Sequence, residues 1–541
     1  MKKLFFIILS FMTLSAFAQQ KKPILIEHSD FIDMNQTEIP GAIVFTGNVT
    51  ILHDGVRIKC NKAYHFKDEN YAKLFGNVQM NQGDTLYMNS RYAEYNGNKK
   101  FAYATGNVMM RSTDMTLTTD TINFDRNIQQ AYYNSYGTIV NGENTLRSKS
   151  GRSFLNQKKY QFTTAVTLTN PKYVLKSNHL DYYTNSGHAY VFGPSTITSK
   201  TDYIYTEKGF YDTKKNKAHL LTNSYIKYDT QIIRGDSLYY DRVKQFSSAT
   251  RNVRVTDTVN KFKVTGHYAE VYRNKDSLMI TKRALAATLV EQDTLYTHAK
   301  RLVVTGKPGS RIMRGYNNAR FYKSDMNGKC DSIHSDEKRG LTQLIKKPVV
   351  WQGQNQMTGD IIHIIANTKT EKIDSLKVMG NAFIIQPDTI GTGYNQIKGK
   401  NLYGKFRDNK LYEVDMVGNA EKIIYMYDKT ELFGIDKGVG SKIHLEIEDN
   451  KITTATLIKK IESQIYPDKE LPQNVRKLRG FTWRGDEMIK SKDDIFPPEE
   501  QELHDKMMNA SKKTRKKSTS LWIRCSKLWI TIKRTRNQKL L

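Results

Sequence analysis

The fold is decided by one stretch, Ile43-Val44-Phe45-Thr46-Gly47-Asn48-Val49-Thr50-Ile51. Apolar residues lie two and four positions on either side of Gly47. A period of two is typical of a β-strand with one apolar face and one solvated face. Because glycine weakens a strand interior, its place in the middle indicates a bulge, a bend or the close approach of another group.

The stretch recurs around Gly76 and Gly106, at spacings of 29 and 30 residues. Weaker copies are centred on Gly380 and Gly418. Tyrosine-rich strands that open with Asp or Asn alternate with these copies, and turn sequences separate them. The middle copies are degenerate, and Arg251 stands where a glycine is expected. A period of about thirty residues predicts an array of repeated strand units.

Composition constrains the partners. The 541 residues include 84 Lys and Arg against 54 Asp and Glu, a net charge of +30. Such an excess indicates an anionic partner, phosphate-rich lipid or nucleic acid, unless it reflects only a general basic bias.

The N-terminus has the pattern of a secretory signal peptide over residues 1–18. Lys2 and Lys3 precede an apolar core from Leu4 to Leu14, and Ala16-Phe17-Ala18 forms a small-residue cleavage site. Export argues against nucleic acid as the partner. No later apolar stretch reaches the length of about eighteen residues that a membrane-spanning helix needs.

The sequence predicts no catalytic residue, no metal site and no cofactor. Cys60, Cys330 and Cys525 are far apart, and the histidines lack ligand spacing. Asp84 and Asp293 recur in phase at strand starts, which favours turn chemistry over a polysaccharide-cleaving carboxylate pair. We therefore expect a protein that is not an enzyme.

The three Gly-Asn-Val copies, at Gly47, Gly76 and Gly106, resemble the OstA-like family. That family includes the periplasmic lipopolysaccharide-transport protein LptA and the N-terminal domain of LptD. The resemblance implies an all-β fold, an elongated repeat β-jellyroll whose two sheets form an open, V-shaped trough. It also implies that lipid A acyl chains bind inside the trough. The alternative is a structural or adhesive β-solenoid whose packed core holds no lipid.

The predicted lipid-binding residues lie on the inward face of the strands. They are Ile43, Phe45, Val49, Ile51, Leu74, Val78, Met80, Ala104, Val108, Met110, Val378 and Ile384. Small inward residues such as Ala72 and Ala104 favour free space between the sheets. Burial of each lipid methylene would contribute roughly 0.8 kcal/mol before costs.

The resemblance further implies a periplasmic carrier or bridge for lipopolysaccharide or lipooligosaccharide, either free in the periplasm or membrane-associated. Its partners would be LptC-like inner-membrane and LptD-like outer-membrane proteins, or further copies of itself, joined end to end by β-augmentation. Exposed edges for this pairing are expected near residues 35–52 and 440–465.

The chain divides by composition. A lead-in over residues 19–34 precedes OstA-like repeats over 35–300. Residues 301–350 read as irregular repeats or a block boundary, and further repeats follow over 351–465. Residues 466–541 are predicted to be a polar linker and a basic, disordered tail, with eleven Lys and Arg and no acid in 512–541. The alternative for the tail is an interfacial amphipathic helix carrying Leu521, Trp522, Leu528, Trp529 and Ile530.

Overall fold

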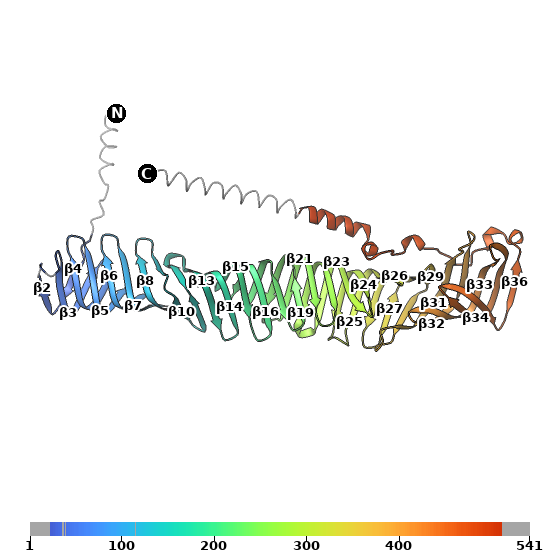
Figure 1. Ribbon diagram of the computed structural model, residues 1–541, viewed down its shortest axis with the longest axis horizontal. Coiled ribbons are helices and arrows are strands. Elements are labelled where there is room, and N and C mark those ends of the chain that lie inside the picture. Colours follow the sequence, from blue (N-terminus) through green and yellow to red (C-terminus); the bar gives the residue numbers. More distant parts are fainter. Residues whose placement is uncertain (1–21, 35–36, 38, 114, 511–541) are drawn as a thin grey trace, which may run out of the picture. The chain divides into compact units, whose positions relative to one another are not determined.

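The structure is a computed structural model that describes residues 22–34, 37, 39–113 and 115–510. The predicted signal peptide and the basic segment 512–541 lie outside the described residues. The chain forms two compact units, Met1–Asp229 and Thr230–Leu541. Both units are built from antiparallel strands joined mainly by hairpins (Figure 1).

The strands of the first unit are mostly about eleven residues long. They are β1 (Leu25–His28), β2 (Phe31–Asp33), β3 (Ile43–His53), β4 (Val56–Phe66), β5 (Tyr71–Gln82), β6 (Leu86–Asn96), β7 (Phe101–Ser112), β8 (Thr116–Asp125), β9 (Gln130–Tyr133), β10 (Gly137–Asn141), β11 (Asn144–Ser148), β12 (Ser150–Phe154), β13 (Lys159–Asn170), β14 (Tyr173–Tyr183), β15 (His188–Thr198), β16 (Asp202–Asp212), β17 (Lys217–Thr222) and β18 (Tyr225–Tyr228). One 3-10 turn, η1 (Leu155–Gln157), joins β12 to β13.

The second unit continues the same alternation with longer strands toward its end. They are β19 (Gln231–Arg234), β20 (Ser237–Asp241), β21 (Phe246–Asp257), β22 (Phe262–Tyr272), β23 (Ser277–Val290), β24 (Asp293–Thr305), β25 (Ile312–Lys323), β26 (Met326–Asp336), β27 (Leu341–Ile345), β28 (Val349–Gln352), β29 (Asn355–Thr358), β30 (Ile361–Ala366), β31 (Ile373–Pro387), β32 (Tyr394–Arg407), β33 (Lys410–Asp428), β34 (Glu431–Glu448), β35 (Lys451–Ile458) and β36 (Glu462–Tyr466). The 3-10 turns are η2 (Arg273–Lys275), η3 (Asp468–Glu470), η4 (Gln473–Val475), η5 (Gly485–Glu487) and η6 (Lys492–Ile495), and residues 498–510 are α-helical.

The central Gly-Asn pair is a β-bulge, which confirms one of the predicted roles of the glycine. In β5, Gly76 and Asn77 both adopt left-handed backbone angles, with φ of +72° and +45°. Phe75 pairs with Lys62 and Gln79 pairs with Lys59, so the register shifts across the bulge. A Cβ on Gly76 would lie 2.8 Å from the side-chain nitrogen of Asn61, so the site requires both the glycine backbone and the missing side chain.

Bulges without glycine keep the array in phase. Thr164-Ala165, Arg251-Asn252, Asn317-Asn318 and Lys346-Lys347 all adopt positive φ at equivalent places. Residues 301–350, expected to be irregular or a boundary, therefore continue as paired strands β24 to β28. The division between the two units lies between Asp229 and Thr230 instead.

Each bulge divides a long strand between two layers. In the first unit, residues such as 43–46 and 71–75 pair within the first layer, and 49–53 and 78–82 pair within the second. Buried side chains alternate in both halves, for example Leu74 on one side of the bulge and Val78 on the other. The all-β jellyroll class predicted from the repeats is confirmed.

Residues 467–510 differ from the predicted polar linker. They form a strap, defined here as residues 467–510, that returns over β31 to β34 and then over β22 to β26 within the second unit (Figure 1). The reason is a set of spaced apolar anchors, Leu471, Leu478, Ile489 and Ile495, whose side chains are buried. The sparse spacing of these anchors between charged residues hides the strap in the sequence.

Candidate functional site

The candidate site is the space between the two layers, which the predicted lipid-binding residues line. Eleven of the twelve are buried, from Val49, Ile51, Leu74, Ala104 and Val378 at 0% exposed to Phe45 at 7%. Ile43, at the start of β3, is partly exposed. The next residue after Val78, Gln79, is exposed, as the period-two pattern requires.

The interior of the first unit is filled by its own side chains. Cavities between the layers have volumes of about 10 to 20 Å³, far below the roughly 300–1,000 Å³ of typical ligand pockets. In one of them Met80, Met88 and Met110 of the second layer face Ile122 and Phe124 of the first. Small residues of the first layer, such as Ala72, thus do not leave free space. Methionine has three rotatable bonds and a polarizable sulfur, so this filling is readily rearranged.

The hairpin ends of the two layers meet in a polar contact that we call the mouth clasp, formed by Lys22, Asp54, Lys100 and Arg126. Asp54 lies in the β3–β4 turn, and Lys100 and Arg126 lie in turns of the first layer. The Asp54 carboxylate pairs with Lys100 at 2.8 Å and with Lys22 at 3.1 Å, and Arg126 Nη2 donates to the Asp54 carbonyl at 3.0 Å. The hydrogen bonds from Lys100 and Lys22 hold the pKa of Asp54 well below its usual range.

A second contact lies behind the clasp. His53 Nδ1 is 2.6 Å from the Tyr95 hydroxyl, which also accepts a hydrogen bond from Arg126 at 3.0 Å. Burial lowers the pKa of His53, so the ring is neutral at pH 7, and burial raises the pKa of Tyr95. Both side chains are almost fully buried, and each has a partner, so this end of the trough is closed by satisfied polar groups.

The second unit closes its mouth in the same manner with other residues. Arg311, beside the start of β25, pairs with Asp257 at the end of β21. Gln352 Nε2 donates to the Asn409 carbonyl at 2.8 Å, and Gln386 Nε2 donates to the Asn450 carbonyl at 2.7 Å. Amide side chains thus replace the charged clasp toward the end of the unit.

Strands at both ends of the array carry exposed apolar side chains. At the N-terminal end, β1 and β2 pair only with β3 among the described strands, and Phe31 and Ile32 are 72% and 60% exposed. At the C-terminal end, β35 and β36 pair only with β34 in the described part of the chain, and Ile461 and Ile465 are exposed. The C-terminal edge lies in the region predicted from the sequence, 440–465. The N-terminal edge was predicted near 35–52 but is formed by residues 25–33, because β1 and β2 pair with β3 and cover it.

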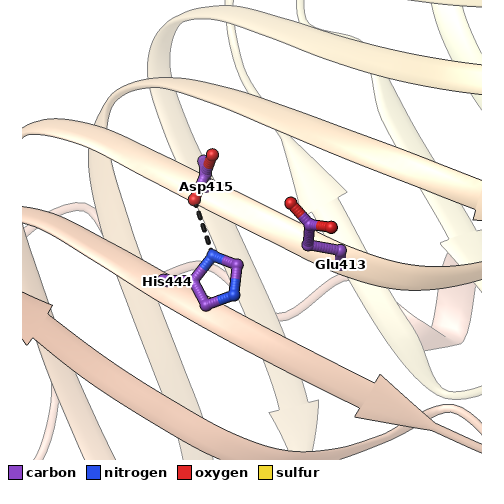
Figure 2. Close-up of side chains that lie close together, drawn as sticks. All are labelled: Glu413, Asp415 and His444. Carbon is purple, nitrogen blue, oxygen red and sulfur yellow. Dashed lines mark hydrogen bonds and ion pairs between the residues drawn. The ribbon is translucent and has the colours of Figure 1, made fainter.

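One side-chain group has metal-ligand composition. Glu413 and Asp415 of β33 and His444 of β34 lie together on one face of the sheet (Figure 2). His444 Nδ1 is 2.8 Å from Asp415, and lysines already neutralise the carboxylates, Lys405 on Glu413 and Lys442 on Asp415, both at 2.8 Å. Two ammonium groups at that distance oppose a divalent cation, so the group is a surface ion-pair network.

Comparisons with known proteins bear on the first unit. Residues 21–178 match the family model described as OstA-like protein. This segment of the chain is similar to the OstA-like family. The match begins at the lead-in and covers β1 to β13 and half of β14, which includes all three Gly-Asn-Val bulges and the mouth clasp. A comparison with curated proteins finds no match.

Among solved structures, one similar chain is LptH from Pseudomonas aeruginosa, described as the LptA homologous periplasmic component of the conserved lipopolysaccharide transport device. The identity is 16%, the TM-score is 0.21, and the alignment covers 27% of this chain and 99% of LptH. In the portion of the chain that the structure describes, no helix is both long and apolar enough to span a bilayer. The family match indicates no catalytic family.

No sequence pattern indicates the mouth clasp. Asp54 and Lys100 are ordinary turn residues 46 positions apart. The two residues are close because both layers bend at the bulges by the same amount. No local sequence pattern indicates the size of that bend. The interior residues were found because burial has a period of two, whereas a contact between turns has no period.

Proposed function

We propose that the chain is a periplasmic carrier that holds an amphipathic lipid of the lipopolysaccharide class between its two layers and passes it toward the outer membrane. The observation that carries the proposal is the continuous apolar interior of an OstA-like segment, lined by Val49, Leu74, Val78 and Val108 and closed on one side by a polar clasp. Such a trough buries acyl chains and leaves sugar and phosphate in water.

Loading requires the layers to separate at the mouth. The clasp ion pairs are partly exposed and each contributes only about 0.2–1 kcal/mol. Burial of each methylene contributes roughly 0.8 kcal/mol, so a few methylenes offset an opened clasp. Met80, Met88 and Met110 then change rotamer to make room, and the bulges remain as the closed corner.

The ends of the array support end-to-end transfer. A partner strand added beside β1 and β2, or beside β35 and β36, would continue the sheet and cover Phe31 and Ile465. The partners proposed are an LptC-like inner-membrane protein, an LptD-like outer-membrane protein or a second copy of this chain. Export by the signal peptide over residues 1–18 belongs to the same proposal, and an N-terminus at Gln19 in the exported protein would support it.

A structural β-solenoid without cargo is the second candidate. The packed interior, with cavities of about 10 to 20 Å³, favours it over a permanently open trough. The two functions differ in one measurable property, because only the carrier exchanges its interior side chains for lipid.

Mass spectrometry of organic extracts from the purified exported protein tests the proposal. A carrier yields acylated glucosamine lipid in stoichiometric amount. Photoreactive residues at Leu74 and Val108 should crosslink to that lipid, and one at the exposed Gln79 should not. Equal crosslinking at all three positions, or extracts without lipid after expression in a lipopolysaccharide-producing host, would leave the structural solenoid as the function.

A further inference from the structure

An open cleft with a volume of about 810 Å³ lies on the second unit, outside the trough. Its walls come from the bulge of β25, the start of β26, the Lys346-Lys347 bulge, the beginning of β30 and the strap. The strap contributes Arg484 and Glu487, so the cleft exists only because residues 467–510 pack back onto the sheet.

Cations outnumber acids in this cleft. The cations are Arg320, Lys329, Lys346, Lys347 and Arg484, and the acids are Asp331, Asp360 and Glu487. The lining therefore carries a net charge of about +2 at pH 7.

The acids are largely committed to structural contacts. Both Asp360 oxygens accept from Asn381 Nδ2, at 3.1 and 3.2 Å, which ties Asp360 to the neighbouring bulge. Glu487 accepts two hydrogen bonds from Arg484, both at 2.8 Å. Only loose pairs reach the other cations, with Lys329 at 3.5 Å from Glu487 and Lys346 at 4.0 Å from Asp331.

Two of the cations have no direct ion-pair partner. Arg320 and Lys347 form no ion pair with any residue in the described ranges. The Arg320 guanidinium makes one long hydrogen bond, from Nε to Asn318 Oδ1 at 3.4 Å. Burial lowers the pKa of Arg320 more than the nearby Glu499, Glu500 and Glu487 raise it, and burial also lowers the pKa of Lys329, so both cations are partly desolvated. A desolvated cation gains more from an anion than a solvated one does.

We propose that this cleft is a binding site for a phosphate group, a phosphomonoester or a pyrophosphate, in which Arg320, Lys329, Lys346 and Lys347 contact the phosphate oxygens. The guanidinium fork of Arg320 matches the geometry of phosphate, and the three lysines act as point charges around it. A phosphomonoester carries roughly −1.5 to −2 at pH 7, which balances the cleft. The site lies outside the layers and does not depend on lipid carriage in the trough.

Titration calorimetry of the full chain with inorganic pyrophosphate tests the proposal. The test variant is Lys346→Asn with Lys347→Asn. Asparagine occupies the equivalent bulge positions Asn317 and Asn318 with positive φ, so the backbone conformation is retained. We expect saturable binding by the native chain and a loss of at least about tenfold in the variant, since each charge-assisted contact contributes roughly this much.

The chain offers a matched control. Lys459 and Lys460 form another lysine bulge in the same unit, with φ of +59° and +51°, and they do not line the cleft. Lys459→Asn with Lys460→Asn removes the same charge and should leave pyrophosphate affinity unchanged. In the opposite direction, Asp331→Asn removes an acid from the cleft and should tighten binding.

Equal weakening by the two lysine pairs, or no saturable binding by the native chain, would overturn the site. Flotation with phosphatidylcholine vesicles, with and without phosphatidic acid, identifies the source of the phosphate. Association that requires phosphatidic acid and is lost in Lys346→Asn with Lys347→Asn assigns the site to a lipid headgroup. Pyrophosphate binding without vesicle association assigns it to soluble phosphate compounds.

Discussion

Two neighbouring residues of β5 provide a direct test of the interior. Val78 is 1% exposed and points between the layers, whereas Gln79 points to solvent. Val78→Asp removes a buried valine side chain, whose burial contributes about 1.5–3 kcal/mol to stability. The new carboxyl group lies opposite the Ser90 hydroxyl. One oxygen stays unpaired, which costs roughly a further 1–3 kcal/mol. The free energy of unfolding of the first unit should therefore fall by about 2.5–6 kcal/mol.

Gln79→Asp is the control. Its register partners are Lys59 and Asn89 on the solvated face, so the change should stay within about 0.5 kcal/mol. The assay must report on the first unit alone. All four tryptophans, Trp351, Trp483, Trp522 and Trp529, lie beyond residue 229, so their fluorescence reports elsewhere. Hydrogen exchange of peptides from β4 to β7 measures the unit directly.

Under the proposed function, Val78→Asp should also remove the co-purifying lipid and Gln79→Asp should retain it. If both variants lowered protection of β4 to β7 equally, the assignment of the two faces would be wrong. If Val78→Asp lost stability and kept its lipid, the interior would be a core and the lipid would bind elsewhere.

The remaining predictions concern the clasp, a bulge, the strap and its pH response. Asp54→Asn removes the ion pairs with Lys100 and Lys22 and should speed exchange of a fluorescent acyl probe. Because these partners lower the pKa of Asp54, the stabilisation they give is complete above the unfolded pKa of Asp54 and is lost only in strong acid. The native chain should therefore exchange the probe at the same rate at pH 7 and pH 5. Thr164→Gly with Ala165→Asn places the Gly-Asn pair at exposed positions that have φ of +63° and +53°. The double substitution should relieve about 1 kcal/mol of backbone strain and so raise the melting temperature of the first unit. An unchanged melting temperature would refute the strain argument. Leu478→Ala should cost about 2–5 kcal/mol of strap docking. It should also expose more of the indole of Trp483, which packs against the same cluster, and this is seen as a red-shifted emission, whereas the exposed Lys469→Ala should leave emission unchanged. Burial, with the charges of Arg320 and Arg283, lowers the pKa of His298 to about 4, against the hydrogen bond to the Ala284 carbonyl and the charge of Glu499. The stabilisation from His298 is therefore present above pH 6.5 and is lost as pH falls toward 4, and Glu500, whose pKa burial raises, opposes this trend. His298→Phe should abolish the loss of helix 498–510 protection between pH 6.5 and 4.5.

The repeat unit, the strand class and the inward face of this protein were determined by local sequence. Gly47, Gly76 and Gly106 mark left-handed bulges because only glycine tolerates both the backbone angle and the crowding at those points. Val49, Leu74 and Val108 alternate with polar residues because one side of every strand is buried. Both patterns depend on residues only a few positions apart, so they can be recognised from the sequence alone.

The positions of the bulges in the later repeats could be determined only from the backbone conformation. Arg251-Asn252 and Lys346-Lys347 adopt the bulge conformation without glycine, because the flanking strands are held in register by their own pairing. A residue with a low intrinsic preference for that conformation is tolerated when the surrounding ladder compensates for its cost. The sequence predicted irregular repeats or a block boundary over 301–350 because the bulge glycines are missing there, although the strands themselves are present.

Only the tertiary structure decided how the trough is closed and what covers the second unit. Asp54 meets Lys100 and Arg126 because two layers fold toward each other over many residues, and charges in turns have no periodic signature. The strap has a polar composition, yet Leu471 and Leu478 anchor it, because a few apolar side chains suffice when a sheet already presents Phe383, Ile385 and Ile423 to receive them. Burial depends on the surface opposite, and that surface lies tens of residues away in the sequence, which is why composition alone assigned the segment to a linker.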